Sequence, residues 1–251
     1  MRSLHIWKLV QYGLIAFPLA FAGLPIYLHA PDFYAIGMGI PIEVIGAALL
    51  FLRLFDALQD PFIGSLSDRF YKQRGFIIVC GALMLAGGMW MIFHPYAAFP
   101  LFWLCLSVLI CTTGFSIVSI NVQALGGLWQ VKAEDVTRIM GAREAIGLCG
   151  LLVASILPTV LLQMYEPNLA FHYLTLSFMP LLIVCSGIFF WWMKTALLMT
   201  PIQNVAVSFK DILRGTPTRL FFLSYLFLGS LLFVKNVRFN YLRTILKSGN
   251  I

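Results

Sequence analysis

Three charged residues stand in the middle of an apolar stretch of the sequence, within the string RLFDALQDPFIG. They are Arg53, Asp56 and Asp60. At about 3.6 residues per turn, a helix places all three within about 60° of one another on one face. Hard cations prefer oxygen ligands, and one guanidinium neutralises only one of two carboxylates. The pattern therefore favours a site of net charge about −1, which a proton or Na⁺ neutralises.

A second interpretation of these charges is structural. Arg53 pairs with Asp56 in a neutral network that fastens this helix to a neighbour, and Asp60 is then left without a role. A charge at membrane depth costs about 2.5–3.5 kcal/mol on insertion scales, so three charges on one face indicate more than chance.

The composition indicates a membrane protein. Of 251 residues, 61% are hydrophobic and only 11% are charged, against about 25% charged in an average globular chain. A spanning helix needs about 20 mostly apolar residues, and backbone groups in lipid require helical pairing. We expect an all-α polytopic membrane protein with six spanning helices. Their expected ranges are 9–29, 42–65, 75–93, 99–122, 143–162 and 172–193.

The basic residues predict the orientation of these helices. Lys and Arg occur before the first helix, between the second and third, between the fourth and fifth, and after the sixth, whereas the alternate loops contain none. This asymmetry predicts a cytoplasmic N-terminus. It also accounts for the net charge of +7 through contact with anionic lipid headgroups. We therefore expect the lipid bilayer as a partner and no nucleic acid.

Other chemistry finds little support in the sequence. The five cysteines all fall inside predicted helices, with no metal-ligand spacing, and no P-loop or nucleophile elbow occurs. We expect no enzymatic activity and no cofactor beyond a coupling ion, H⁺ or Na⁺.

The segment that follows the charged helix carries a first resemblance. The string GSLSDRFYKQRG contains Gly64, Asp68, Arg69 and Arg74. It resembles the signature loop between helices 2 and 3 of the major facilitator superfamily, which implies a gating loop. In addition, we expect Gly64 to permit close helix packing.

A second resemblance is more specific and covers residues 11–219. The pattern Arg53-x-x-Asp56-Ala57-x-x-Asp60-Pro61-x-x-Gly64 is similar to helix 2 of the glycoside–pentoside–hexuronide:cation symporters, the melibiose permease group. The strings QYGLIAFPLAF and TRIMGAREAIGLCGLLVASILP resemble the first helix and the beginning of the fifth helix of that family. The chain thus resembles the N-terminal half of such a transporter.

This resemblance implies a coupling-cation site. Asp56 and Asp60 match the two cation-binding acids of helix 2, and Gln59 stands where the melibiose permease has an asparagine. The helix 4 hydroxyl of the family falls at or next to Ser119.

The same resemblance implies a solute site with two departures. Arg143 matches an arginine near the sugar pocket. Ala20 and Asn121, however, align with aspartates that the melibiose permease has in helices 1 and 4. A pocket without those acceptors should not hold a galactoside in the same way.

Further polar residues are candidates for solute contact. Asn121 and Gln123, near the inner end of the fourth helix, either line the cavity or form a helix–helix hydrogen bond. Tyr12 either stacks on substrate or anchors the helix at the membrane interface. Glu144 either neutralises Arg143 or takes part in a charge network with it.

The expected organisation has three parts. Residues 1–193 form the six-helix bundle, built from two inverted three-helix repeats, residues 194–219 form a cytoplasmic linker, and residues 220–251 form a truncated or aberrant start of a C-terminal half. A bundle of this kind alternates access only against a second bundle. We therefore expect the chain alone to be inactive or partial in transport, and to need a second-half chain or a homodimer.

The sequence favours one function class and leaves others open. The favoured class is cation-coupled symport of a sugar, a glycoside or a similar small polar solute, in what we expect to be a bacterial inner membrane. The alternatives are a non-transporting membrane remnant, an interaction subunit, and a carrier of lipid or nucleoside.

Overall fold

The first membrane stretch is helical throughout but irregular. A computed structural model describes residues 5–129 and 133–199. It begins with α1 (Ile6–Gly13) and α2 (Ala16–Leu24), continues through a π-helical turn, η1 (Pro25–His29), and ends with α3 (Ala30–Met38). Pro25 lacks a backbone N–H and cannot complete the regular ladder, and this accounts for the wide turn at that point.

Five further long helices follow. They are α4 (Ile42–Arg69), α5 (Arg74–Ile92), α6 (Pro100–Gly127), α7 (Ala133–Met164) and α8 (Pro167–Thr195), with a short 3₁₀ turn, η2 (Tyr71–Gln73), before α5. Five stretches in the described part are long and apolar enough to cross a membrane. The charged helix α4, although 28 residues long, is not among those five.

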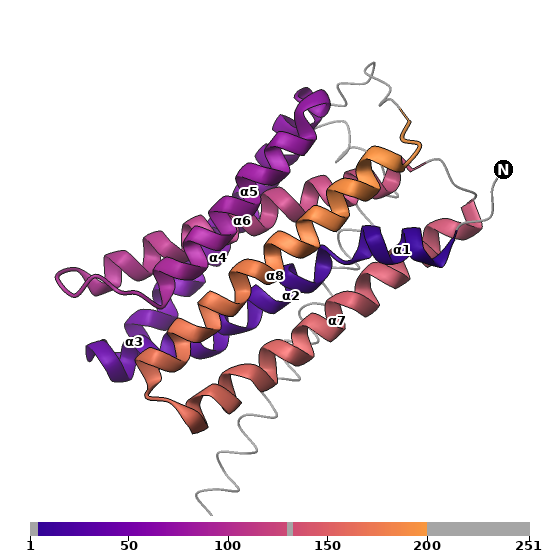
Figure 1. Cartoon of the computed structure of the whole chain (residues 1–251). Coiled ribbons are helices and arrows are strands. Elements are labelled where there is room, and N and C mark those ends of the chain that lie inside the picture. Colours follow the sequence, from indigo (N-terminus) through magenta and orange to yellow (C-terminus); the bar gives the residue numbers. More distant parts are fainter. Residues whose placement is uncertain (1–4, 130–132, 200–251) are drawn as a thin grey trace, which may run out of the picture. The chain divides into compact units, whose positions relative to one another are not determined.

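The helices pack in the pattern that two exchanged repeats require. The first stretch packs on α7 through α1 and α2, and α6 packs on α4. Likewise α6 packs on α5, the first stretch packs on α8, and α5 meets α8 (Figure 1). Exchanging the first three membrane stretches with the last three turns the first pair into the second and the third into the fourth, and it turns the α5–α8 pair into itself. These pairings are compatible with the expected two-repeat organisation, which stays a prediction.

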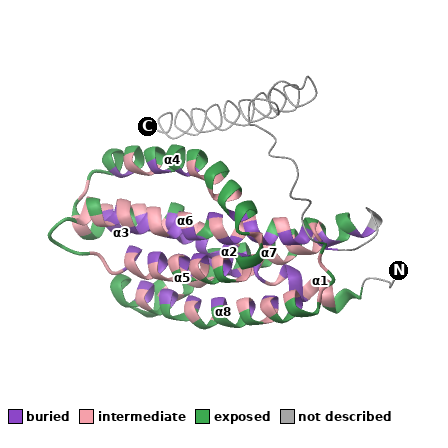
Figure 2. Cartoon of the chain, turned by 90° about the horizontal axis from the view of Figure 1, so that it is seen from above, coloured by how far each residue is buried: buried purple, intermediate pink, exposed green. Residues whose placement is uncertain are grey.

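Two glycines allow the closest helix contacts. A Cβ atom at Gly114 of α6 would meet the backbone of Leu85 in α5, and one at Gly150 of α7 would meet the backbone of Phe17 in α2. Small residues at such positions let helices approach in lipid, where apolar burial gives no driving force. The buried residues of α2, α6 and α8 line the interior, whereas α4 exposes much of its length (Figure 2).

The structure corrects three expectations about the elements. The loop expected after residue 29 is helix α3, because Pro31 is tolerated in a first helical turn and Gly39, with φ of 66°, ends the helix. Helix α7 begins at Ala133 rather than at 143. A Cβ at Gly64 would meet no atom within 4 Å, so the expected close packing there is wrong in this conformation.

The proposed linker 194–219 is described only to residue 199, where its first residues complete α8 and follow it. The segment 220–251 lies outside the described residues.

Candidate cation and solute sites

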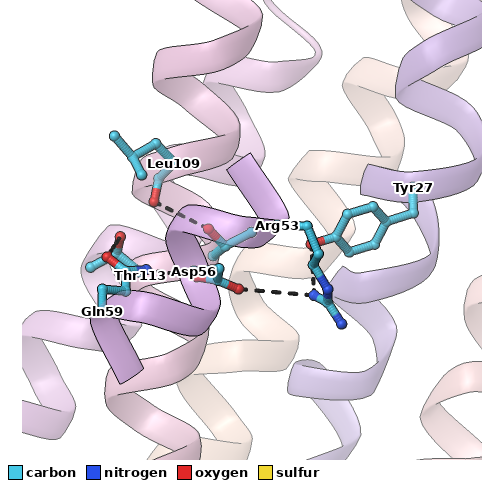
Figure 3. A network of polar contacts seen from close by, with 7 residues as sticks. Tyr27, Arg53, Asp56, Gln59, Leu109 and Thr113 are labelled. Atoms are coloured by element: carbon cyan, nitrogen blue, oxygen red, sulfur yellow. Dashed lines mark hydrogen bonds and ion pairs between the residues drawn. The ribbon is translucent and has the colours of Figure 1, made fainter. Parts of the chain in front are cut away.

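The carboxylate of Asp56 is the centre of a polar network between α4 and α6. Its side chain is buried, and its Oδ1 accepts a hydrogen bond of 2.6 Å from Nε2 of Gln59, one turn further along α4. The Oε1 of Gln59 accepts a hydrogen bond of 3.2 Å from the hydroxyl of Thr113 on α6. Figure 3 shows these side chains together between the two helices.

The guanidinium of Arg53 contributes little neutralisation to this network. Its NH1 lies 3.9 Å from Oδ2 of Asp56 and donates a hydrogen bond of 2.9 Å to the hydroxyl of Tyr27 in η1 (Figure 3). The Arg53 side chain is 66% exposed, whereas that of Asp56 is 12% exposed. An exposed, distant partner compensates a buried carboxylate only weakly.

The second carboxylate, that of Asp60, has an unmet hydrogen-bonding requirement. Its Oδ1 is buried and has no hydrogen-bond partner. Buried polar oxygens are normally paired, and an exception points to a missing ligand or to strain. The two carboxylates therefore leave a negative charge on α4 that Arg53 does not balance.

Pro61 frees a backbone oxygen, in addition to the two carboxylates, in the same stretch of α4. Proline has no backbone N–H, so the carbonyl of Ala57, four residues earlier, lacks its helical donor. Backbone carbonyls are common ligands of hard cations. The Asp60-Pro61 pair was part of the sequence pattern, but the free carbonyl of Ala57 was not predicted from it.

The hydroxyl expected from Ser119 is not the one that joins this network. The bonded hydroxyl is that of Thr113, whereas Ser119 accepts a hydrogen bond of 3.0 Å from Nε2 of Gln123 and lines a separate cavity. Thr113 was missed because position 113 carries no motif. The signal that could have found it was a hydroxyl inside an apolar helix.

That separate cavity lies between α2, α6 and α7. It has a volume of about 130 Å³, and its polar wall is formed by Ser119, Arg143 and Glu144. Ala20 also lines it, at the position where the resemblance implied an acid. Pockets for drug-sized ligands begin at about 300 Å³, so this cavity admits a small solute or one part of a larger one.

Arg143 is the only cation on the wall of this cavity, within the described residues. Its NH2 donates to Oε1 of Glu144 at 2.6 Å, its Nε is buried without a partner, and its side chain is 17% exposed. Glu144 is 68% exposed. The pair is neutral and leaves the buried Nε–H of Arg143 without a partner, which suits a neutral, oxygen-rich solute.

Three candidates for solute contact lie elsewhere in this conformation. Asn121 is fully buried and ties α6 to α4, because its Oδ1 accepts a hydrogen bond of 2.6 Å from Ser67. Tyr12 is buried in the core and donates a hydrogen bond of 3.1 Å to the carbonyl of Val122. Gln123 is exposed and reaches the cavity only through Ser119.

The residues of the expected gating loop lie mostly in helix: Gly64, Asp68 and Arg69 are in the last two turns of α4, and Arg74 begins α5. Asp68 accepts a hydrogen bond of 2.7 Å from NH2 of Arg74, which is buried at the first turn of α5. Arg69 is exposed at the end of α4. The structure brings Asp68 and Arg74 together but leaves Gly64 and Arg69 outside that pair.

Comparison with known proteins agrees with this architecture. The family model described as MFS/sugar transport protein matches residues 9–249. A search of the curated proteins found no match. With its helices long and apolar enough to cross a membrane several times, the chain is an integral, multi-pass membrane protein, and it belongs to the MFS/sugar transport protein family.

Proposed function

We propose that this chain serves cation-coupled symport of a sugar, a glycoside or a similar small polar solute. The finer membership that the sequence suggests is the glycoside–pentoside–hexuronide:cation symporter group, with the N-terminus in the cytoplasm of a bacterial cell. The observation that supports this proposal most is the uncompensated charge on α4. The exposed Arg53 lies 3.9 Å from Asp56, and a carboxylate oxygen of Asp60 is buried without a partner.

The proposed cation ligands come from one short stretch of α4 and from α6. Asp56, Asp60 and the free carbonyl of Ala57 supply oxygens, while Gln59 and Thr113 hold the carboxylate of Asp56 in place. Ser119, which the resemblance suggested as a ligand, is assigned to the solute side instead. Asp68 and Arg69 at the end of α4 and Arg74 at the start of α5 would form the junction that responds when the sites are filled.

The solute would bind beside Arg143 in the cavity between α2, α6 and α7. Arg143 donates to a hydroxyl oxygen of the solute, and Glu144 keeps the pair neutral. Thr113 and Ser119 lie six residues apart, which is about 9 Å along α6, so one helix borders both sites. Binding of cation and of solute would then each raise the affinity of the other by the same factor, as linkage requires.

Equilibrium binding tests this proposal directly. Purified full-length chain in detergent is titrated with a panel of labelled monosaccharides and glycosides, in Na⁺ medium, in choline medium, and over a range of proton concentrations. We expect at least one sugar to bind more tightly when the coupling cation is present. A panel in which no sugar binds, or in which binding ignores both cations, would contradict the proposal.

A further inference from the structure

A second cavity lies at the basic end of α4 and α5, away from the cation and solute sites. Its volume is about 230 Å³, and most of its wall is apolar. The apolar lining residues are Ile63, Leu66, Phe70, Phe76, Ile77 and Ile117. It therefore extends from the end of α4 into the contact between α5 and α6.

The polar groups on this wall need few hydrogen bonds from an occupant of the cavity. The hydroxyl of Ser67 already donates to Oδ1 of Asn121 at 2.6 Å. The Gln73 side chain, which also lines the cavity, is exposed and can turn to the headgroup region. A hydrocarbon chain fits such a wall, whereas a polar solute would lose hydrogen bonds there.

Two basic residues adjoin lining residues of the cavity in sequence, because Arg69 precedes Phe70 and Lys72 precedes Gln73. The guanidinium of Arg69 lies 6.0 Å from the centre of the Phe70 ring, and Phe70 is part of the cavity wall. The ammonium of Lys72 lies 5.9 Å from the ring of the neighbouring Tyr71. Both basic side chains are exposed, and a long cationic side chain at this depth meets the lipid headgroups.

These charges have no counterpart in the described part of the protein. Asp68, the nearest acid in sequence, is engaged by Arg74 at 2.7 Å, and neither Arg69 nor Lys72 forms an ion pair among residues 5–129 and 133–199. Arg74 itself is 5% exposed and keeps two N–H groups, Nε and NH1, without partners. The positive charges of Arg69 and Lys72 at this end of the bundle are therefore available to bind an anion.

We propose that this place binds one phospholipid with an anionic headgroup. An acyl chain occupies the cavity between α4, α5 and α6, and the headgroup phosphate lies between Arg69 and Lys72. The apolar wall lies next to basic side chains. This arrangement complements such a lipid, whose apolar acyl chains adjoin an anionic headgroup. The site goes beyond the proposed symport and does not depend on it.

Native mass spectrometry of the full chain, released from detergent, tests this site. The chain is equilibrated with phosphatidylglycerol or with phosphatidylcholine of the same acyl chains. We expect one phosphatidylglycerol to stay bound at activation energies that remove phosphatidylcholine. The double variant Arg69→Gln/Lys72→Gln should lower the preference for phosphatidylglycerol about 20-fold, while Lys8→Gln, a basic residue on α1, should leave it unchanged.

A second variant tests the cavity separately from the charges. Ile63→Trp places an indole in the cavity and should remove the tightly bound lipid of either headgroup, whereas Phe62→Trp, at an exposed neighbour, should not. Circular dichroism checks that both variants keep their helix content. Glycerol 3-phosphate, which lacks acyl chains, should not displace the lipid. Displacement by it, an unchanged headgroup preference in the double variant, or an equal loss in Lys8→Gln would overturn the proposal.

Discussion

The helices α4 and α7 are the second helices of the two expected repeats, yet their charges are balanced differently. On α4, the largely exposed Arg53 lies 3.9 Å from Asp56, and Oδ1 of Asp60 is buried without a hydrogen-bond partner. On α7, Arg143 meets Glu144 at 2.6 Å in a neutral pair. Each helix packs on the first helix of the other repeat. The difference supports our proposal that α4 holds a charge for a cation, while α7 offers a neutral, hydrogen-bonding wall for a solute.

The largest expected effect comes from removing the surplus charge on α4. Asp60→Asn should abolish the dependence of solute binding on the cation, because the site no longer has a negative charge to neutralise. The coupling free energy that is lost is typically about 1–3 kcal/mol. Isothermal titration with and without cation measures the loss. Glu43→Gln, an exposed acid in the first turn of the same helix, is the matched control and should behave as the unmodified chain.

Removing the arginine of α7 should give a smaller effect of a different kind. Arg143→Gln should weaken solute binding about 10-fold or more, because a charge-assisted hydrogen bond contributes about 1.5–3 kcal/mol. Cation binding in the absence of solute should be unchanged. Loss of both bindings together would show that Arg143 supports the fold and not the solute alone, and would end the assignment of separate roles to α4 and α7.

A pair of variants on α6 should give the smallest effects and separate the two sites. Thr113→Val removes the hydroxyl that holds Gln59 and should weaken cation affinity about fivefold, close to one net hydrogen bond. Ser119→Ala removes the hydroxyl in the other cavity and should alter solute affinity only. Cation affinity that falls in Ser119→Ala and not in Thr113→Val would restore Ser119 as the ligand.

The choice of ion follows from the direction in which the Gln59 amide points. Its NH₂ group faces Asp56 and its oxygen faces Thr113, an assignment that rests on the hydrogen-bond network. Na⁺ needs several oxygens at fixed distances, and this amide offers it none. We therefore expect H⁺ to be the coupling ion. Solute affinity that rises with Na⁺ at constant pH, and does not respond to protons, would reverse this prediction.

The membrane class, the long helices and the grouping of charges on α4 could be predicted from sequence because they depend on local composition and on helical period. The hydrogen-bond partners of the polar residues could not be predicted in this way. Thr113 lies on another helix, 54 residues from Gln59, and no periodicity connects them. For Asn121 the sequence left a cavity role and a helix–helix hydrogen bond open, and the structure shows the second, with Ser67 54 positions away. Which face of a helix meets which neighbour is decided by packing.

Two local features also could not be predicted from the sequence: the helix that begins around Pro31 and the hydrogen bond of Tyr12. Pro31 and the apolar residues after it read as a loop, although a proline in the first turn is compatible with helix, and α3 ends only at the left-handed Gly39. Tyr12 read as an interface residue because its ring is amphipathic, but its hydroxyl finds a backbone carbonyl inside the bundle.

The most direct test of the account counts the cations that α4 binds. Purified full-length chain in weakly buffered choline medium is mixed with the sugar that binds it best, and an indicator dye follows proton uptake, while radioactive Na⁺ binding is measured in parallel. We expect uptake of one monovalent cation per chain. That uptake should be absent in the double variant Asp56→Asn/Asp60→Asn and intact in Glu43→Gln. Cation uptake that persists in the double variant would contradict the claim that the carboxylates of α4 form the coupling site.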